Sequence, residues 1–248
     1  MAERLEGRNA VTEALRSGRR VLKVLLADGV KPAGVSDLVA AAAAARVPVE
    51  TVSRRELDRD SEHGAHQGVV ALVEPYQFTP LSRILAGTAG RERSLLIALD
   101  QVTDPGNLGA VIRTADVAGA DGVITTKNRS APMTAAAYKA AAGAAEHIPV
   151  ARESNLVQTL EACKAAGYWI AGASEHADRL AWDAPLEGRL VLVMGSEGEG
   201  LARLTQRQCD FLVGLPVTGP VGSLNVSAAT AVLAFEWVRR GRRLDGCA

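Results

Sequence analysis

Cysteine and aromatic residues are scarce in this 248-residue chain, and neither sign of charge is in excess. The cysteines Cys163, Cys209 and Cys247 lie far apart in the sequence and form no C-x-x-C pair, which excludes a disulfide framework and a cysteine-ligated zinc site. This usage predicts a reduced, cytoplasmic protein. The 28 basic residues cancel the 28 acidic ones, so any attraction for a polyanion must come from a local patch.

Long apolar runs and catalytic signatures of several common enzyme classes are also missing. No run approaches the ~20 residues that span a bilayer, so we expect no membrane partner. His63 and His66 have no third ligand near them in the sequence, so we expect no metal. There is no G-x-S-x-G elbow, which disfavours a serine hydrolase. A G-x-G-x-x-G pattern is missing after the apolar run at 94–100, which disfavours a dinucleotide-binding enzyme.

Residues 1–75 alternate short apolar runs with helical patterns. Helices are predicted at 8–18 and 35–46, and strands at 21–27, 47–52 and 67–74. This rhythm indicates a small α/β domain. Residues 76–93 are predicted to be a linker with one short helix at 81–86, because proline and glycine interrupt the pattern there.

Residues 94–248 form the second predicted domain, whose strands are more strongly apolar. Continuous apolar strands separated by helices indicate an α/β fold with a parallel sheet covered on both faces. The last helix is expected at about 223–240. The predicted strands are SLLIALD (94–100), GVITT (122–126), HIPVA (147–151), YWIAGA (168–173), RLVLVMG (189–195) and FLVGLP (211–216).

Glycine-bearing polar loops follow three of these strands: DQVTDPGNLGAVIR, MGSEGEGL and LPVTGPVGSLNVS. Ligands of open parallel sheets bind at the carboxyl ends of strands, so the three loops together indicate a site. Each loop also has a structural alternative. In these alternatives the first glycines only open a helix, Arg113 pairs with Asp116 on the surface, GSEGEG is a solvated acidic loop, and Ser223 caps the last helix.

At these loops the sequence resembles the SpoU (TrmH-type) RNA ribose 2′-O-methyltransferases of the SPOUT class. The matching features are Asn107 and Arg113 in the first loop, VMGSEGEGL in the second, and the SLNVS block in the third. LEGRNAVTEAL and HQGVVALV resemble the N-terminal substrate-binding domain of the branch that methylates a guanosine in large-subunit (23S) ribosomal RNA.

The resemblance implies a homodimer and a C-terminal domain whose end is threaded into a deep trefoil knot. It also implies an N-terminal domain like ribosomal protein L30e. S-adenosylmethionine would be the methyl donor, with no metal, held largely through the backbone of Gly195, Leu215 and Leu224. Arg113 would act on the ribose hydroxyl as a base or as an electrostatic stabiliser. Asn107 would orient Arg113 or the ribose, and Glu197 would hold Arg113 or bind a ribose edge. Ser223 and Asn225 would hydrogen-bond the substrate or position the first motif.

Basic side chains in the N-terminal domain are the predicted contacts to RNA phosphate. Other functions remain open at this point: a tRNA ribose methyltransferase, an rRNA methyltransferase that confers antibiotic resistance, or a non-catalytic ribosome-assembly factor on the same fold. An ordinary solvated surface is the alternative for the basic residues. These residues are Arg8, Arg16, Arg19 and Arg20.

Overall fold

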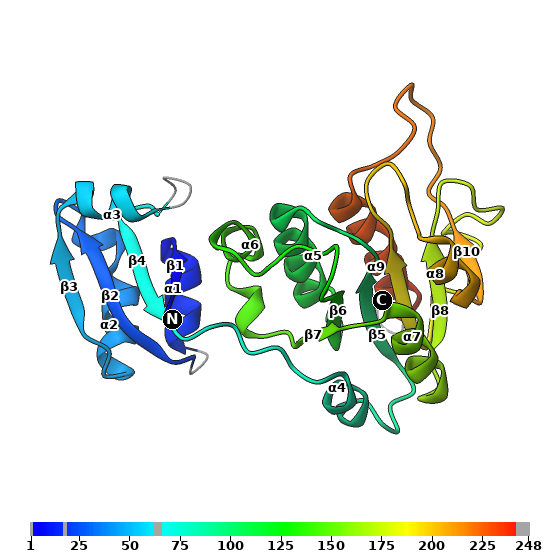
Figure 1. Cartoon of the computed structure of the whole chain (residues 1–248), viewed down its shortest axis with the longest axis horizontal. Coiled ribbons are helices and arrows are strands. Elements are labelled where there is room, and N and C mark those ends of the chain that lie inside the picture. The colour runs from blue at the N-terminus through cyan, green and yellow to red at the C-terminus, as the bar shows by residue number, and fades with distance from the viewer. Residues whose placement is uncertain (1, 17–18, 62–65, 242–248) are drawn as a thin grey trace, which may run out of the picture.

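Two α/β units lie side by side along the long axis of the molecule (Figure 1). The structure is a computed structural model, and it describes residues 2–16, 19–61 and 66–241. His63 and Cys247, which the sequence analysis considered, lie outside the described residues. Within those residues, no helix combines the length and apolar character that a membrane span requires.

The N-terminal unit is built on a four-stranded mixed sheet in the order β1-β4-β2-β3. Strands β2 (Val21–Ala27), β3 (Val49–Val52) and β4 (Val69–Val73) correspond to the three predicted strands. Strand β1 (Glu3–Glu6) pairs antiparallel with β4 and was not predicted. Its sequence, ERLE, has one apolar side chain among three charged ones and therefore no strand pattern. The segment is a strand because it pairs with β4.

Only some helices of this unit have a sequence pattern from which they can be predicted. Helices α1 (Arg8–Arg16) and α2 (Ser36–Ala44) were predicted, whereas α3 (Arg54–Asp60) was not. Only Leu57 in α3 is apolar, and it is buried, so no hydrophobic stripe marks the helix. A capping box at its start, formed by Ser53 and Glu56, stabilises it instead. A short 3-10 helix (Pro32–Gly34) precedes α2.

The second unit contains the predicted parallel sheet, with six strands in the order β10-β8-β9-β5-β6-β7. Every neighbouring pair is parallel. All residues of the central strand β5 are buried, because helices cover both faces of the sheet. The strands are β5 (Ser94–Leu99), β6 (Gly122–Thr126), β7 (Val150–Glu153), β8 (Trp169–Ala173), β9 (Arg189–Met194) and β10 (Phe211–Val213).

Alternate residues of β5 enter two different cores. Leu95, Ile97 and Leu99 belong to the larger core, which also contains residues of α5 (Pro105–Val117), α6 (Ala135–Ala141) and α9 (Val226–Gly241). Leu96 and Ala98 face the smaller core with residues of α4 (Leu81–Gly87) and α7 (Leu156–Ala165). The predicted linker therefore contributes its helix to the packing of the second unit. The other helices are η2 (Ala144–Glu146) and α8 (Arg203–Gln208).

Gly109 is required for the close approach of α5 and α6. A Cβ atom at this position would lie 2.1 Å from the backbone oxygen of Ala137 and 2.7 Å from the Cβ of Ala140. The neighbouring helix backbone cannot yield to such a contact without moving. The glycine of the first motif therefore serves helix packing, and it brings the motif-bearing helix against α6.

We expect Gly109→Ala to lower the free energy of unfolding by ~1–3 kcal/mol, the usual cost of overpacking. Urea denaturation of the purified protein measures this change. Gly87→Ala is the matched control, since a Cβ there meets nothing within 4 Å and the backbone φ is not positive. Equal stability of the two variants would contradict the packing role of Gly109.

Candidate active site at the carboxyl edge of the parallel sheet

The first and second motif loops are joined where strands β5 and β9 end. Asp100, just past β5, donates its backbone N–H to the Met194 carbonyl at 2.8 Å. Its buried carboxylate accepts the Ala202 backbone N–H, also at 2.8 Å. The segment from 195 to 201 is thereby anchored to β5 at both of its ends. Glu197, in the middle of that segment, is held near the start of α5.

Three side chains from three separate loops meet at this edge. Asn107 Nδ2 donates to Glu197 Oε1 at 2.8 Å. Asn225 Nδ2 donates to the same oxygen at 2.8 Å and to Asn107 Oδ1 at 2.9 Å. We call Asn107, Glu197 and Asn225 the polar triad. The structure thus brings together three of the five residues that the resemblance assigns to catalysis.

Asn107 is fixed by the start of α5. Asp104 is the N-cap residue, and its carboxylate accepts the Asn107 backbone N–H at 2.7 Å. Pro105 occupies the first helical turn, where its missing N–H costs no hydrogen bond. The Asn107 side chain is buried, so its amide requires the partners that Glu197 and Asn225 supply.

Asn225 has a second role as the cap of α9. Its Oδ1 accepts the Ser227 backbone N–H at 2.8 Å and the Ser227 hydroxyl at 2.6 Å. These two bonds identify the oxygen of the amide and therefore direct Nδ2 toward the other two members of the triad. The predicted start of the last helix near 223 is corrected, because the helix begins at Val226. Asn225, and not Ser223, caps it.

Gly195 is required by a close approach within the second loop. A Cβ at this position would lie 2.2 Å from the carbonyl carbon of Gly200 and 2.5 Å from the backbone nitrogen of Leu201. Ser196 and Gly200 exchange two backbone hydrogen bonds at 3.0 Å, which close the loop. Gly198 and Gly200 have φ values of +86° and +66°, which favour glycine. GSEGEG is therefore an ordered turn.

Arg113 lies on α5, six residues after Asn107, which is ~9 Å along the helix axis. Its exposed side chain lines a cleft of about 770 Å³ between the two units. In the described part of the chain, no ion pair joins it to Asp116 and no hydrogen bond joins it to Glu197. Neither of these two contacts of Arg113 is thus present among the described residues, and Glu197 instead accepts hydrogen bonds from Asn107 and Asn225.

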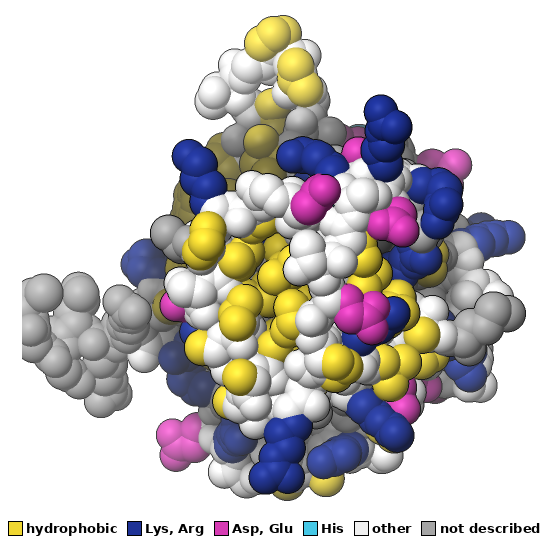
Figure 2. All heavy atoms as spheres, turned by 90° about the vertical axis from the view of Figure 1, so that its left-hand side faces the viewer, with side chains coloured by type: hydrophobic (Ala, Val, Ile, Leu, Met, Phe, Trp, Pro, Cys, Tyr) yellow, Lys and Arg dark blue, Asp and Glu magenta, His cyan; other side chains and the backbone are white. Residues whose placement is uncertain are grey.

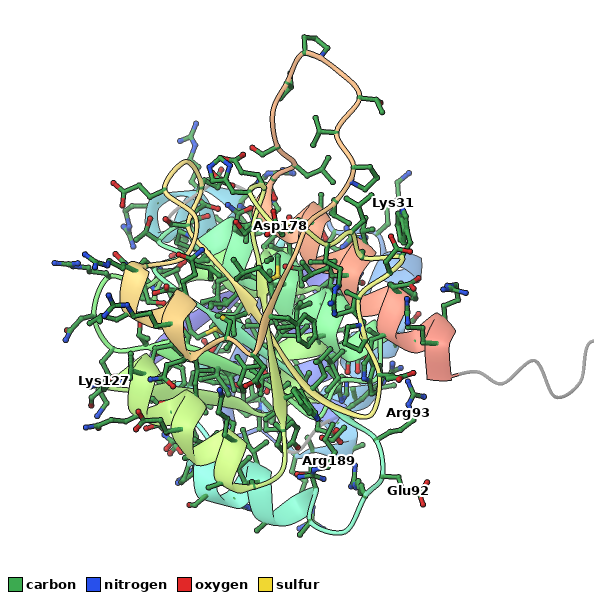
Figure 3. All side chains as sticks on the ribbon, turned by 90° about the vertical axis from the view of Figure 1, so that its right-hand side faces the viewer. Lys31, Glu92, Arg93, Lys127, Asp178 and Arg189 are labelled. Carbon is green, nitrogen blue, oxygen red and sulfur yellow. The ribbon has the colours of Figure 1, made fainter. Side chains whose placement is uncertain are left out.

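The third loop projects from the molecule between β10 and α9 (Figure 3). Leu215 is partly buried against the larger core, whereas Ser223 is exposed and Leu224 is 52% exposed. Val217 and Val221 are also exposed, which leaves an apolar loop in solvent. Apart from Pro216 and Pro220, which have no N–H, residues 215–224 carry backbone N–H groups that find no backbone partner within residues 66–241. These groups are therefore available to a ligand.

Arg8, Arg16 and Arg20 are accessible, but Arg19 is not. The Arg19 side chain is 9% exposed and lies between the two units. Its guanidinium donates to Glu146 at 2.6 Å and to the Tyr138 hydroxyl at 2.7 Å, and it lies over the Tyr138 ring. Burial raises the pKa of Tyr138, so the phenol remains a neutral partner. Arg19 thus joins the units, and the prediction that it contacts RNA is corrected.

Replacing Arg19 with methionine is expected to lower the free energy of unfolding by ~3 kcal/mol, because the buried Glu146 carboxylate would lose its partner. Guanidinium chloride unfolding measures the effect. Arg20→Met is the control: Arg20 is 74% exposed and pairs with Glu74 at 3.0 Å, a surface pair worth at most ~1 kcal/mol. A larger loss from Arg20→Met than from Arg19→Met would contradict the role of Arg19.

The outer face of the N-terminal unit is largely apolar at its centre, with Lys and Arg side chains around it (Figure 2). No residue of the polar triad belongs to this unit. The basic side chains on this outer face therefore lie apart from the triad.

Neither a metal cluster nor a reactive thiol is found near the triad. Among the described residues, no group of at least three His, Cys, Asp or Glu side chains has the arrangement to hold a metal ion. Burial raises the pKa of the Cys163 and Cys209 thiols to about 12. Both thiols are therefore protonated at neutral pH and are poor nucleophiles.

Asp100, Asp104 and Ser227 support the triad but were not singled out in the sequence. Asp104 had a local signal, since Asp followed by Pro is typical of a helix start. Ser227 follows Asn225 by two residues, the spacing of an Asx turn. Asp100 had no local signal, because its partner Ala202 is 102 residues away.

Comparison with known proteins bears on both units. Residues 94–235 match the SpoU rRNA Methylase family, and residues 4–79 match the RNA 2′-O ribose methyltransferase substrate binding family. A 23S rRNA (guanosine-2′-O-)-methyltransferase, RlmB, of Pseudomonas aeruginosa is 46% identical over 98% of both chains.

Solved structures agree. An AdoMet-bound rRNA methyltransferase from Sinorhizobium meliloti is 29% identical with a TM-score of 0.79, over 96% of this chain and 87% of that one. The SpoU methyltransferase AviRb from Streptomyces viridochromogenes, in complex with AdoMet, is 27% identical with a TM-score of 0.80, over 96% and 90%. The predicted resemblance is confirmed: this chain belongs to the SpoU rRNA methylase family.

Proposed function

We propose that this protein transfers a methyl group from S-adenosylmethionine to the ribose 2′-hydroxyl of a guanosine in 23S rRNA. The observation that supports this most is the polar triad, because three motif loops far apart in the chain converge on one oxygen of Glu197. The RlmB relative carries this activity in its name.

S-adenosylmethionine supplies the electrophilic methyl group when bound. The residues present fit such a ligand: apart from Pro216 and Pro220, residues 215–224 carry backbone N–H groups that lack backbone partners, and Gly195 allows the second loop to fold back on itself at the same edge of the sheet. Leu215 and Leu224 would contribute main-chain N–H and C=O groups, as Gly195 would. The AdoMet complexes of two structural relatives support the same assignment.

The ribose hydroxyl is a poor nucleophile until it loses its proton. Because a guanidinium stays charged in proteins, Arg113 acts as a cation that stabilises the developing alkoxide and binds the adjacent phosphate. The triad fixes the second and third loops relative to α5, and this arrangement holds donor and acceptor in line. Ser223 lies two residues before Asn225 and contacts the substrate. Arg8, Arg16 and Arg20 contact RNA phosphates.

The working form is a cytoplasmic homodimer that is knotted at its C-terminal end. Exposed apolar side chains on α9 support self-association: Phe235 is 46% exposed, and Val232, three residues before it on the same face of the helix, is 36% exposed. Neighbouring exposed apolar side chains are typical of surfaces that a partner covers.

Methyl transfer from tritiated S-adenosylmethionine to unmodified 23S rRNA tests the proposal, with tRNA and 16S rRNA assayed in parallel. We expect label on 23S rRNA alone, mapping to one guanosine 2′-oxygen. Label on tRNA alone would assign the substrate to the tRNA class. Free rRNA and assembling large-subunit particles are both supplied as substrates. Absence of label on both would contradict the proposed methyltransferase activity and favour a non-catalytic assembly factor.

A further inference from the structure

The cleft between the two units combines charges of both signs. Its N-terminal wall carries Arg8 and Arg16 of α1, and its opposite wall carries Arg113 of α5. A groove that only follows an RNA backbone would be basic throughout. The cleft instead also contains three carboxylates, those of Glu13, Asp37 and Asp116.

Two of these carboxylates already have partners. Glu13 lies 3.3 Å from Arg16 and 3.0 Å from His147 on the opposite wall. Asp37, whose side chain is 84% exposed, lies 3.9 Å from Arg16. The contacts of Glu13 and Asp37 with neighbouring side chains therefore explain why these two carboxylates lie in the cleft.

Asp116 is different. Within residues 2–16, 19–61 and 66–241, neither Asp116 nor Arg113 has a hydrogen bond or ion pair through its side chain. They lie three residues apart on α5, a spacing at which opposite charges often pair, and both line the cleft. Because the two side chains line the same cleft and do not pair with each other, one ligand can contact the Arg113 cation and the Asp116 anion together.

A nucleotide has complementary groups. Its phosphate suits Arg113, but a carboxylate repels phosphate, so Asp116 requires hydrogen-bond donors from the base. The Watson–Crick edge of guanine offers two adjacent donors, N1–H and the 2-amino group, which match the two oxygens of a carboxylate. Uracil has a single donor on this edge, and adenine and cytosine each have one amino group. The rise of ~4.5 Å between residues three apart on a helix places Asp116 beyond Arg113 along α5, farther from Asn107 and the polar triad.

We propose that Asp116 determines specificity by accepting hydrogen bonds from the guanine base of the target nucleotide, while Arg113 contacts the ribose and phosphate of the same nucleotide. This inference rests on the proposed function, since it concerns the nucleotide that is methylated. It assigns Asp116 on the α5 wall of the cleft to base recognition, and it leaves methyl transfer to Arg113 and the polar triad.

The test compares kcat/KM for two RNA fragments of the large subunit that carry guanosine or inosine at the methylated position. Inosine lacks the 2-amino group, so it cannot form the second bond to Asp116. We expect the unaltered protein to favour guanosine by about 10-fold or more, the usual range for losing a base contact. Asp116→Ala should reduce kcat/KM on guanosine by a similar factor and bring the ratio of the two substrates close to 1.

Asp37→Ala is the matched control, because it removes a carboxylate from the opposite wall of the same cleft. It should keep the preference for guanosine. Retention of the preference by a folded Asp116→Ala variant that binds S-adenosylmethionine normally would overturn the inference, as would equal use of both RNAs by the unaltered protein. In both cases the guanosine RNA is still methylated, whereas failure of the proposed function would leave both of these large-subunit RNA fragments unmethylated.

Discussion

Replacing Arg113 with alanine is expected to lower kcat by about 10²–10³-fold, the effect of removing one stabiliser of a developing oxyanion. The guanidinium is exposed and has no side-chain partner in the described part of the chain, so folding does not depend on it. We expect the free energy of unfolding to change by no more than ~0.5 kcal/mol. Single-turnover methyl transfer at saturating RNA measures the chemical step.

Arg113→Lys separates charge from geometry. Lysine keeps the positive charge but lacks the planar fork that binds alkoxide and phosphate together, so we expect activity between those of the alanine variant and the unaltered protein. Calorimetry should find unchanged affinity for S-adenosylmethionine in both variants. Near-normal turnover of the alanine variant with intact cofactor binding would remove Arg113 from the mechanism.

Replacing Asn225 with alanine is expected to have two separable effects. Loss of its Nδ2 donor breaks its bonds to both Asn107 and Glu197, and we expect kcat/KM to fall by about 10²-fold as the third loop loses its fixed relation to α5 and to the second loop. Loss of its Oδ1 acceptor removes the cap of α9, which is expected to cost ~1 kcal/mol of stability. Thermal unfolding and methyl transfer measure the two effects.

Asn225→Ser distinguishes them. Serine is a good N-cap residue, so α9 keeps its cap, but the hydroxyl is too short to replace the amide in the triad. We expect the serine variant to unfold at nearly the same temperature as the unaltered protein and to be as inactive as the alanine variant. If the serine variant were fully active, the triad would be only a structural feature.

The sequence indicated the fold class because its signals are local. The central strands of the parallel sheet, β5 and β9, are buried on both faces and are therefore continuous apolar runs, as LLIAL in β5 shows. The same reasoning explains why two elements were not predicted. Strand β1 and helix α3 each bury one apolar residue, Leu5 and Leu57, so no periodic pattern reveals them. The trefoil knot stays a prediction from the resemblance.

The residues of the candidate site could be named from the sequence, but the hydrogen bonds between them could not be predicted from it. Asn107, Glu197 and Asn225 were assigned through motif resemblance, and only the folded chain brings them into contact across separations of 90 and 118 residues. Glu197 was expected to hold Arg113 or to bind a ribose edge. In the structure its Oε1 accepts hydrogen bonds from the amides of Asn107 and Asn225, and Arg113 lines the cleft.

The arginines show the same division most clearly. The sequence by itself determined that this chain is an α/β protein with three glycine-bearing loops at strand ends and a cluster of basic residues near its start. It did not distinguish Arg19 from Arg20, because adjacent arginines have the same chemistry. Only the tertiary structure buries Arg19 between Glu146 and Tyr138 and leaves Arg20 in solvent. The burial and partners of a charge depend on residues more than 100 positions away, so its role emerges only with the fold.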